Sequence, residues 1–199
     1  MAIPCQTAVP LRKYRLVLSP TARHIQSMIT RVHQKSDAYS EALYSSCERY
    51  RYMLTRTWDT LGRKALFIML NPSTATELQN DPTVERCERR ARTLGFGAFR
   101  VTNIFAWRDT DPRKMRAAVD PIGPENDRTI IQSCVWADQI IAAWGTHGSH
   151  KNRGAEVAVL LHDSGLPIFH LGLTKGGHPK HPLYIAYSQQ PEIWPLPQP

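Results

Sequence analysis

Short apolar segments alternate with helix-like segments along most of the chain. Four of the apolar segments have the length of buried strands: Ala65–Leu70, Phe99–Asn103, Gln139–Trp144 and Pro167–Leu171. Start and stop signals predict helices between and beside them, at residues 82–94, 112–118, 124–136 and 153–164. Apolar strands that alternate with helices are typical of a parallel sheet with helices on both faces. We therefore predict a three-layer α/β/α sandwich whose mainly parallel sheet has about four core strands.

The segments before these strands have other patterns. Arg49–Trp58 alternates and is rich in Tyr and Thr, which predicts an antiparallel edge strand with one solvated face. Thr21–Ser40 has apolar residues at the spacing of a short amphipathic helix, and three prolines lie in the first twenty positions. We therefore predict a basic accessory arm at residues 1–44 and a single α/β domain at residues 45–199.

The net charge of +8 is concentrated in the predicted arm. Residues 1–39 carry six Lys or Arg against Asp37, a net charge of +5, so only +3 is left for the remaining 160 residues. A basic segment is typical of nucleic-acid binding through phosphate neutralisation, and a solvated leader is the other interpretation. DNA or nucleotides are therefore the expected partners, although the charge of the domain alone does not single them out.

The sequence pattern contains no targeting or membrane signal. No apolar run approaches the ~20 residues that span a bilayer. The first residues lack a basic region followed by an apolar core, so no secretory signal is predicted. The four cysteines form no C-x-x-C pair, which favours reduced thiols over disulfides or a zinc site. We therefore expect a cytoplasmic protein, with no indication of its oligomeric state.

Polar and aromatic residues follow each of the four predicted core strands. The carboxyl ends of parallel strands meet at one edge of a sheet, and ligands of open α/β sheets bind there. Asp81 is most simply an N-cap, but it lies ten residues after Asn71 and would face the same cleft. We therefore predict a substrate site at this edge, formed by Asn71, Pro72, Ser73, Thr74, Asn103, Phe105, Trp107, Trp144, Gly145 and Lys175.

Each of these segments also has a purely structural interpretation. The loop at residues 71–74 has the composition of a turn, because Asn and Ser bond their own backbone and Pro fixes φ. Asn103 could cap a turn, and the tryptophans could pack in the core. Lys175, followed by two glycines, could form a surface loop or approach an anion. The sequence leaves these alternatives open.

Motifs for metals, nucleotide phosphates and activated nucleophiles are missing from the sequence. His147, His178 and His181 match no zinc spacing and have no cysteine nearby, so we predict no metal site. The chain lacks the G-x-S-x-G elbow, the G-x-x-x-x-G-K-[ST] phosphate loop and a G-x-G-x-x-G turn after a strand. We therefore expect no bound cofactor.

Eight short motifs, taken in order, resemble one known family. They are Cys47–Tyr52, Leu70–Ala75, Asn80–Thr83, Asn103–Ala106, Asp120–Asp127, Trp144-Gly145, Thr174-Lys175 and His181–Tyr184. Together they resemble the bacterial and phage family called domain of unknown function 1643. The resemblance covers roughly residues 45–187, and it implies a common architecture without an established chemistry.

A second resemblance, to uracil-DNA-glycosylase-like proteins, rests on three motifs in the order found in that superfamily. They are Asn71-Pro72, Asn103 and His181-Pro182. The resemblance implies a compact α/β domain in which Asn71 or Asp81 positions a water for attack on the sugar carbon. It also implies that Asn103 reads an extruded base and that His181 stabilises the leaving base, so that the catalytic residues would be Asn71, Asp81 and His181. An aromatic residue, Phe105 or Trp107, would stack on the base.

Three functions are compatible with these observations. The first is a nucleobase- or nucleotide-handling enzyme. Its most specific version is a hydrolase of the N-glycosidic bond that acts on a modified or extruded base. The second is a non-catalytic module that binds nucleic acid or nucleotide through the basic arm and the same cleft. The third is hydrolysis of a phosphate ester, which rests only on Lys175 and the two glycines after it.

Overall fold

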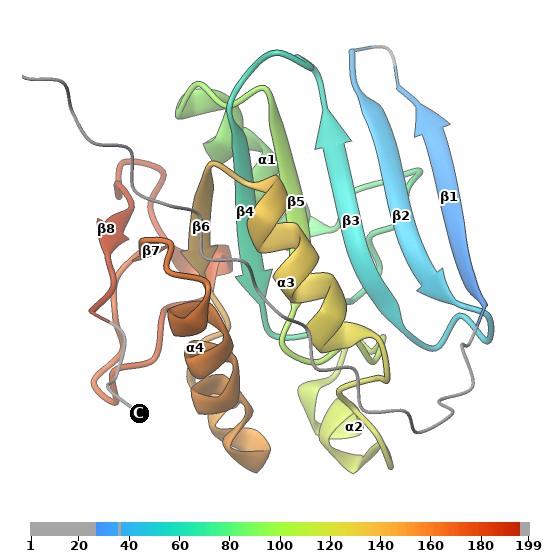
Figure 1. Cartoon of the computed structure of the whole chain (residues 1–199), viewed down its shortest axis with the longest axis vertical. Helices are drawn as coiled ribbons and strands as arrows, with labels where there is room; N and C mark the ends of the chain where they lie inside the picture. The colour runs from blue at the N-terminus through green and yellow to red at the C-terminus, as the bar shows by residue number, and fades with distance from the viewer. Residues whose placement is uncertain (1–26, 36, 196–199) are drawn as a thin grey trace, which may run out of the picture.

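The computed structural model describes residues 27–35 and 37–195 and places eight strands in one sheet (Figure 1). The spatial order of the strands is β1-β2-β3-β5-β4-β6-β7-β8. Their bounds are Met28–Gln34 (β1), Tyr39–Ser45 (β2), Arg51–Thr57 (β3), Lys64–Met69 (β4), Ala98–Asn103 (β5), Gln139–Ala142 (β6), Ile168–His170 (β7) and Glu192–Ile193 (β8). None of the helices in this part of the chain is long and apolar enough to cross a membrane.

Helices pack on both faces of the sheet (Figure 1). They are α1 (Pro82–Thr93), α2 (Pro112–Ala117), α3 (Asn126–Trp136) and α4 (Arg153–Asp163), with 3₁₀ turns η1 (Thr146–Asn152) and η2 (Pro182–Tyr184). The central strand β4 explains the arrangement. Its residues Ala65, Phe67 and Met69 pack with α1 on one face, whereas Leu66 and Ile68 pack with α3 and α4 on the other. A strand buried on both faces has to be apolar at every position.

The sheet is mixed, so the predicted mainly parallel sheet is wrong. Strands β5, β4, β6 and β7 are parallel neighbours, as expected for the alternating part of the chain. However, four of the seven pairings between the described strands are antiparallel: β1 with β2, β2 with β3, β3 with β5, and β7 with β8. The error has a physical cause, because the three strands before β4 are joined by hairpins and extend the parallel core at its β5 edge.

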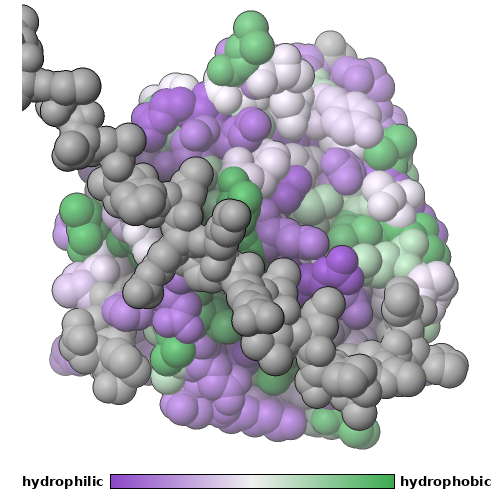
Figure 2. Space-filling view, in the orientation of Figure 1, coloured by the Kyte–Doolittle hydropathy of each residue, from purple (hydrophilic) through white to green (hydrophobic). Residues whose placement is uncertain are grey.

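The predicted helix within Thr21–Ser40 is replaced by strands where the structure describes this segment, and residues 1–26 lie outside the described residues. The sheet therefore begins at Met28, ahead of the predicted domain boundary at residue 45. The helix prediction from residue spacing was wrong for two reasons. Every second side chain of β2 packs in the core, which is the period of a strand. Strand β1 is stabilised by its pairing with β2 and not by a pattern of its own. Hydrophobic surface remains over β1 and β2 on the face shown in Figure 2.

The segment expected to be a solvated edge strand is an internal strand. Strand β3 pairs with β2 on one side and β5 on the other, and all its residues except Thr57 are buried. Two of these buried residues are Arg51 and Arg56, which lie in the segment predicted to have one solvated face. They are covered by the loop that joins β4 to α1.

Hydrogen bonds from β2 and β3 hold the loop between β4 and α1 against the sheet. The guanidinium of Arg51 donates to the carbonyl of Ala75. The guanidinium of Arg56 donates to the carbonyl of Thr76 at 2.6 Å and to Asn80 Oδ1 at 3.0 Å. In addition, Ser40 Oγ donates to the carbonyl of Glu77, and Tyr44 Oη donates to the carboxylate of Glu77. The loop has no regular secondary structure of its own, so its conformation depends on these buried donors.

Replacing Arg56 with methionine tests this dependence. The change removes donors from several buried oxygens of the loop, so we expect the free energy of unfolding to fall by about 2–4 kcal/mol. Urea unfolding followed by circular dichroism measures this fall, and limited proteolysis should detect earlier cleavage within residues 72–80. The matched variant Arg128→Met changes a surface side chain that is 65% exposed, and it should lie within about 0.5 kcal/mol of wild type. Equal unfolding midpoints for the two variants would contradict the proposed dependence.

Candidate functional site

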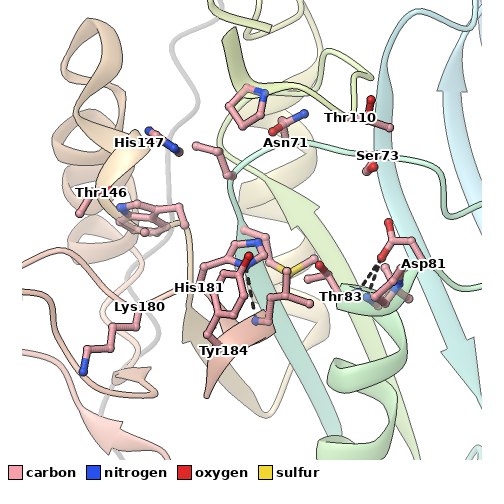
Figure 3. A pocket seen from close by; sticks show the side chains of 18 of the residues that line it. Asn71, Ser73, Asp81, Thr83, Thr110, Thr146, His147, Lys180, His181 and Tyr184 are labelled. Atoms are coloured by element: carbon pink, nitrogen blue, oxygen red, sulfur yellow. Dashed lines mark hydrogen bonds between the residues drawn. The ribbon is translucent and has the colours of Figure 1, made fainter. Parts of the chain in front are cut away.

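A cavity of about 700 Å³ lies where β4 and β6 end (Figure 3). The loop after β4, the first turn of α1, the loop before α2, and the segments around η1 and η2 all contribute to its wall. Seven of the predicted site residues line it: Asn71, Ser73, Thr74, Asp81, Trp144, Gly145 and His181. The cavity size falls in the range of small-molecule and cofactor sites.

The loop at residues 71–74 is a cross-braced turn that also lines the cavity. Asn71 Nδ2 donates to the carbonyls of Pro72, at 3.1 Å, and Asp109, at 2.7 Å. The backbone N–H of Asp109 donates to the carbonyl of Pro72 at 3.0 Å. Pro72 is itself buried and lies outside the cavity wall, whereas Ser73 and Thr74 are part of it. Because both donors of the Asn71 amide face carbonyls, the amide oxygen is the atom left to accept a hydrogen bond from a ligand.

Asp81 joins this loop to the first turn of α1. Its Oδ1 accepts hydrogen bonds from the backbone N–H groups of Thr83, at 3.0 Å, and Val84, at 2.8 Å, as an N-cap does. Its Oδ2 accepts from the backbone N–H of Ala75 at 3.3 Å. The carboxylate is therefore a structural cap and a negative charge in the cavity wall at the same time.

Arg51 places a buried positive charge beside the cavity. It lies in β3, is 1% exposed and contributes to the cavity wall. Burial lowers the pKa of Arg51 to about 10, and the negative charge of Asp81 opposes that shift, so the guanidinium is charged at neutral pH. Its Nε is buried and has no hydrogen-bond partner among the described residues. An uncompensated buried donor of this kind favours an anionic or strongly accepting ligand.

His181 is held as a neutral hydrogen-bond donor. Burial lowers its pKa to about 4; the charge of Asp81 opposes this shift and His147 adds to it. Its Nδ1 accepts from the backbone N–H of Leu183 at 3.5 Å and caps η2. With Nδ1 used as an acceptor, the proton of the neutral ring is assigned to Nε2. The imidazole can therefore offer an N–H without carrying a charge.

The β6 end supplies the shape of the wall beside His181. Gly145 has φ 71° and donates its N–H to the carbonyl of Pro179 at 2.7 Å. A positive φ strains any residue with a Cβ, which explains a glycine at this turn. Trp144 is 1% exposed and packs edge-on against Trp194, with ring centroids 5.4 Å apart. Its Nε1 is buried without a partner among the described residues.

Besides Pro72, four other predicted site residues lie outside this cavity. Asn103 is 1% exposed, and its carbonyl accepts from Asn126 Nδ2 at 2.9 Å, so it belongs to the interior. Phe105 is fully buried in the core cluster that contains α3 and α4. Trp107 lines a separate hollow, and Lys175 is exposed and lines neither. The structure therefore does not bring Asn103 or Phe105 to a place where either could touch a base in the cavity.

Several cavity residues were missed by sequence reasoning. Arg51 was assigned to a solvated edge strand, and nothing in the local pattern indicated that its side chain is covered. Tyr184 ends the family motif at residues 181–184 and Lys180 comes just before it, but neither was assigned to the site. Tyr184 is 86% exposed at the cavity rim, where an aromatic ring is free to stack on a ligand.

The side chains that commonly bind metals are His, Cys, Asp and Glu. In the described part of the chain, no group of three or more of them is arranged to hold a metal ion. His147 lies at the cavity wall but contacts the guanidinium of Arg116 through Nδ1. Burial, with the charge of Arg116, lowers the pKa of His147, so this ring is neutral as well.

The depressed pKa of His181 predicts a specific pH dependence of stability. The unfolded chain takes up a proton near pH 6.5, whereas folded His181 does so only near pH 4. The stabilisation is therefore complete above pH 6.5 and is lost as the pH falls towards 4. Asn at this position retains an acceptor for the Leu183 N–H but does not titrate. We expect wild type to lose about 2 kcal/mol more than His181→Asn between pH 7 and pH 4 in urea unfolding.

Parallel pH profiles for wild type and His181→Asn would contradict the assignment of a neutral, half-buried imidazole. The comparison cancels the contributions of His147, His150 and His170, whose pKa values burial also lowers.

Comparison with known proteins places the chain in a family. No curated protein matches the chain. The family described as "Protein of unknown function (DUF1643)" matches residues 51–183, which run from β3 through the start of η2 and include every residue of the cavity described above except Tyr184 and Ile185. Because this match covers about two thirds of the sequence, the chain belongs to the DUF1643 family.

Proposed function

We propose that the cavity binds a nucleobase or nucleotide as a substrate. The specific reaction that we propose is hydrolysis of an N-glycosidic bond. The observation that carries the proposal is the neutral imidazole of His181, held as an Nε2–H donor in the same cavity as the buried cation Arg51. A base that leaves a sugar departs with negative charge. A fixed neutral donor and a nearby cation are the groups that stabilise such a charge as it develops.

The hydrogen-bonding pattern of the wall supports a base as the ligand. Asn71 offers an acceptor oxygen because its two N–H groups are used by carbonyls, and His181 offers a donor. A nucleobase edge that carries one N–H and one carbonyl is complementary to this pair. The exposed ring of Tyr184 at the rim, rather than the buried Phe105, is the aromatic that would stack on it.

The chemical step needs only water as co-reactant. Water oxygen forms a bond to the sugar carbon, the bond from that carbon to the base nitrogen breaks, and the electron pair stays on the base. The departing base accepts a hydrogen bond from His181 Nε2, and the proton of the attacking water ends on the base or in solvent. Asp81 is the group that positions the water, through Oδ2, because the amide oxygen of Asn71 accepts from the base.

Binding without turnover is a second candidate, favoured by the bonding of Asp81. Three backbone N–H groups already donate to this carboxylate, so both of its oxygens have structural partners and are less available to orient a water. The same cavity would then recognise a base or nucleotide without cleaving it. A turnover assay separates the two candidates.

The test is incubation of the protein with single-stranded DNA that contains uracil or modified thymines, and with free nucleotides. Released base is followed by liquid chromatography. We expect His181→Ala to slow release by roughly 10²–10³-fold, because it removes the donor to the leaving base. Asn71→Ala should also slow release, because it removes the acceptor oxygen. His178→Ala is the matched control, since His178 lies in the same segment outside the cavity wall, and it should behave as wild type.

Calorimetric titration with the same compounds covers the second candidate. Binding that is lost in Asn71→Ala and retained in His178→Ala, without release of base, would replace the hydrolase by a binding module. If no compound binds or turns over, the proposal of a nucleobase site fails.

A further inference from the structure

A second hollow shares a wall with the cavity. It has a volume of about 630 Å³, and its own residues are Glu48, Arg49, Gln79, Trp107 and Arg108. Four residues line both spaces: Ser73, Thr74, Asp109 and Thr110. The two spaces therefore lie on either side of one ridge, which we call the 73/110 ridge after the first and last of its residues in the sequence. A ligand that fills the cavity and continues across this ridge enters the second hollow directly.

The 73/110 ridge is rigid and polar. The hydrogen bonds of Asn71 and Asp109 described above join its two halves. Within the described part of the chain, no hydrogen bond uses the backbone N–H of Ser73 or Thr74. These two N–H groups and the hydroxyls of Ser73, Thr74 and Thr110 are donors without net charge, and such donors accommodate a phosphate oxygen.

The second hollow combines an aromatic ring with basic side chains. Trp107 is half-buried and is held edge-on against Tyr50, with ring centroids 5.6 Å apart. Arg49 is exposed. Arg108 is half-buried; one of its Nη atoms donates to the carbonyl of Glu48, and its Nε is buried without a partner among the described residues. An aromatic platform with arginines beside it is the arrangement that binds single-stranded nucleic acid.

The acidic residues of the second hollow already have partners. The carboxylate of Glu48 pairs with Arg31 at 2.6 Å. Asp109 Oδ1 accepts from the backbone N–H of Asp111 at 2.9 Å. These contacts reduce the repulsion that either carboxylate would exert on a phosphate. With Arg31 included, three arginines face two carboxylates here, so the hollow and its ion-pair partner carry a net charge of +1.

We propose that the second hollow is a subsite for a neighbouring nucleotide, so that the protein takes single-stranded oligodeoxynucleotide rather than a mononucleotide. One base occupies the cavity, the phosphate that links the two nucleotides crosses the 73/110 ridge, and the next base stacks on Trp107. Arg49 and Arg108 contact the phosphate beyond it. This inference rests on the proposed nucleobase site, and it adds the class of substrate and a specificity residue, Trp107.

The test compares thymidine monophosphate with an oligothymidylate of four nucleotides by isothermal titration calorimetry. We expect the wild-type protein to bind the oligonucleotide at least tenfold more tightly. Trp107→Ala should weaken oligonucleotide binding by roughly 5- to 100-fold and leave monophosphate binding unchanged. Trp107→Phe should restore most of the loss, because a ring for stacking remains. Arg49→Ala should weaken only the oligonucleotide, with a smaller dependence of its affinity on salt.

Matched controls separate local effects from loss of charge or of folding. Arg89→Ala removes one exposed arginine that lines neither space, and it should leave both affinities within about twofold of wild type. Thermal unfolding of Trp107→Ala checks that the variant is folded, and its unchanged affinity for the monophosphate is the internal check. Equal affinity of wild type for the two ligands, or equal weakening of both by Trp107→Ala, would overturn the subsite.

The outcomes also separate this inference from the proposed function. If monophosphate binds in a manner that depends on Asn71 and the oligonucleotide gains nothing, the subsite fails and the nucleobase site stands. If neither ligand binds, the subsite fails, and the base-release assay with uracil or modified thymines decides the nucleobase site separately. If only the oligonucleotide binds and Trp107→Ala abolishes that binding, the subsite is supported as the larger part of the recognition surface.

Discussion

The structure depends on buried arginines that donate hydrogen bonds to loop carbonyls. Arg51 and Arg56 project from β3 and hold the loop between β4 and α1, which has no ladder of its own. The buried Arg90 and the half-buried Arg86 of α1 hold η2 and the segment after it in the same way. They donate to the carbonyls of Pro182, Ile185, Ala186, Tyr187 and Gln189. A guanidinium has five donors in a fixed fork, so one side chain can satisfy several carbonyls of an irregular segment. Arginine side chains therefore position both the loop between β4 and α1 and the segment around η2, which form opposite parts of the cavity wall.

This use of arginine changes the meaning of the chain's basic composition. Arg51, Arg56, Arg90 and Arg153 are each no more than 2% exposed, so part of the positive charge outside the N-terminal segment stabilises the interior. Net charge counted along a sequence cannot separate such residues from those on the surface. Among these four, Arg51 is the one that also lines the cavity, and its charge is the one that a ligand could use.

The sequence predicted the fold well for elements whose burial requires an apolar pattern. It predicted the fold poorly for strands that are stabilised by pairing with a neighbouring strand. Strand β4 and helix α1 were predicted nearly to the residue, because a doubly covered strand must be apolar and Asp81-Pro82 marks a helix start. Strands β1 and β2 were missed, because a strand whose partner supplies its stability needs no strong pattern of its own. The cavity was also predicted only in part. Asn71 and His181 lie in recognisable motifs, whereas Arg51 reaches the cavity from β3, which was predicted to be a solvated edge strand.

Turn chemistry and ligand binding at Asn71 are not alternatives. The hydrogen bonds that make residues 71–74 a turn consume both N–H groups of the Asn71 amide and so determine which atom remains for a ligand. The same holds for His181, whose role as the cap of η2 assigns its proton to the other ring nitrogen. A residue that is locked by a structural hydrogen bond presents its remaining polar atom in one orientation, which is what a preorganised site requires. Structural roles at the ends of β4 and before η2 therefore strengthen the case for a site, since they fix one acceptor and one donor within the same cavity.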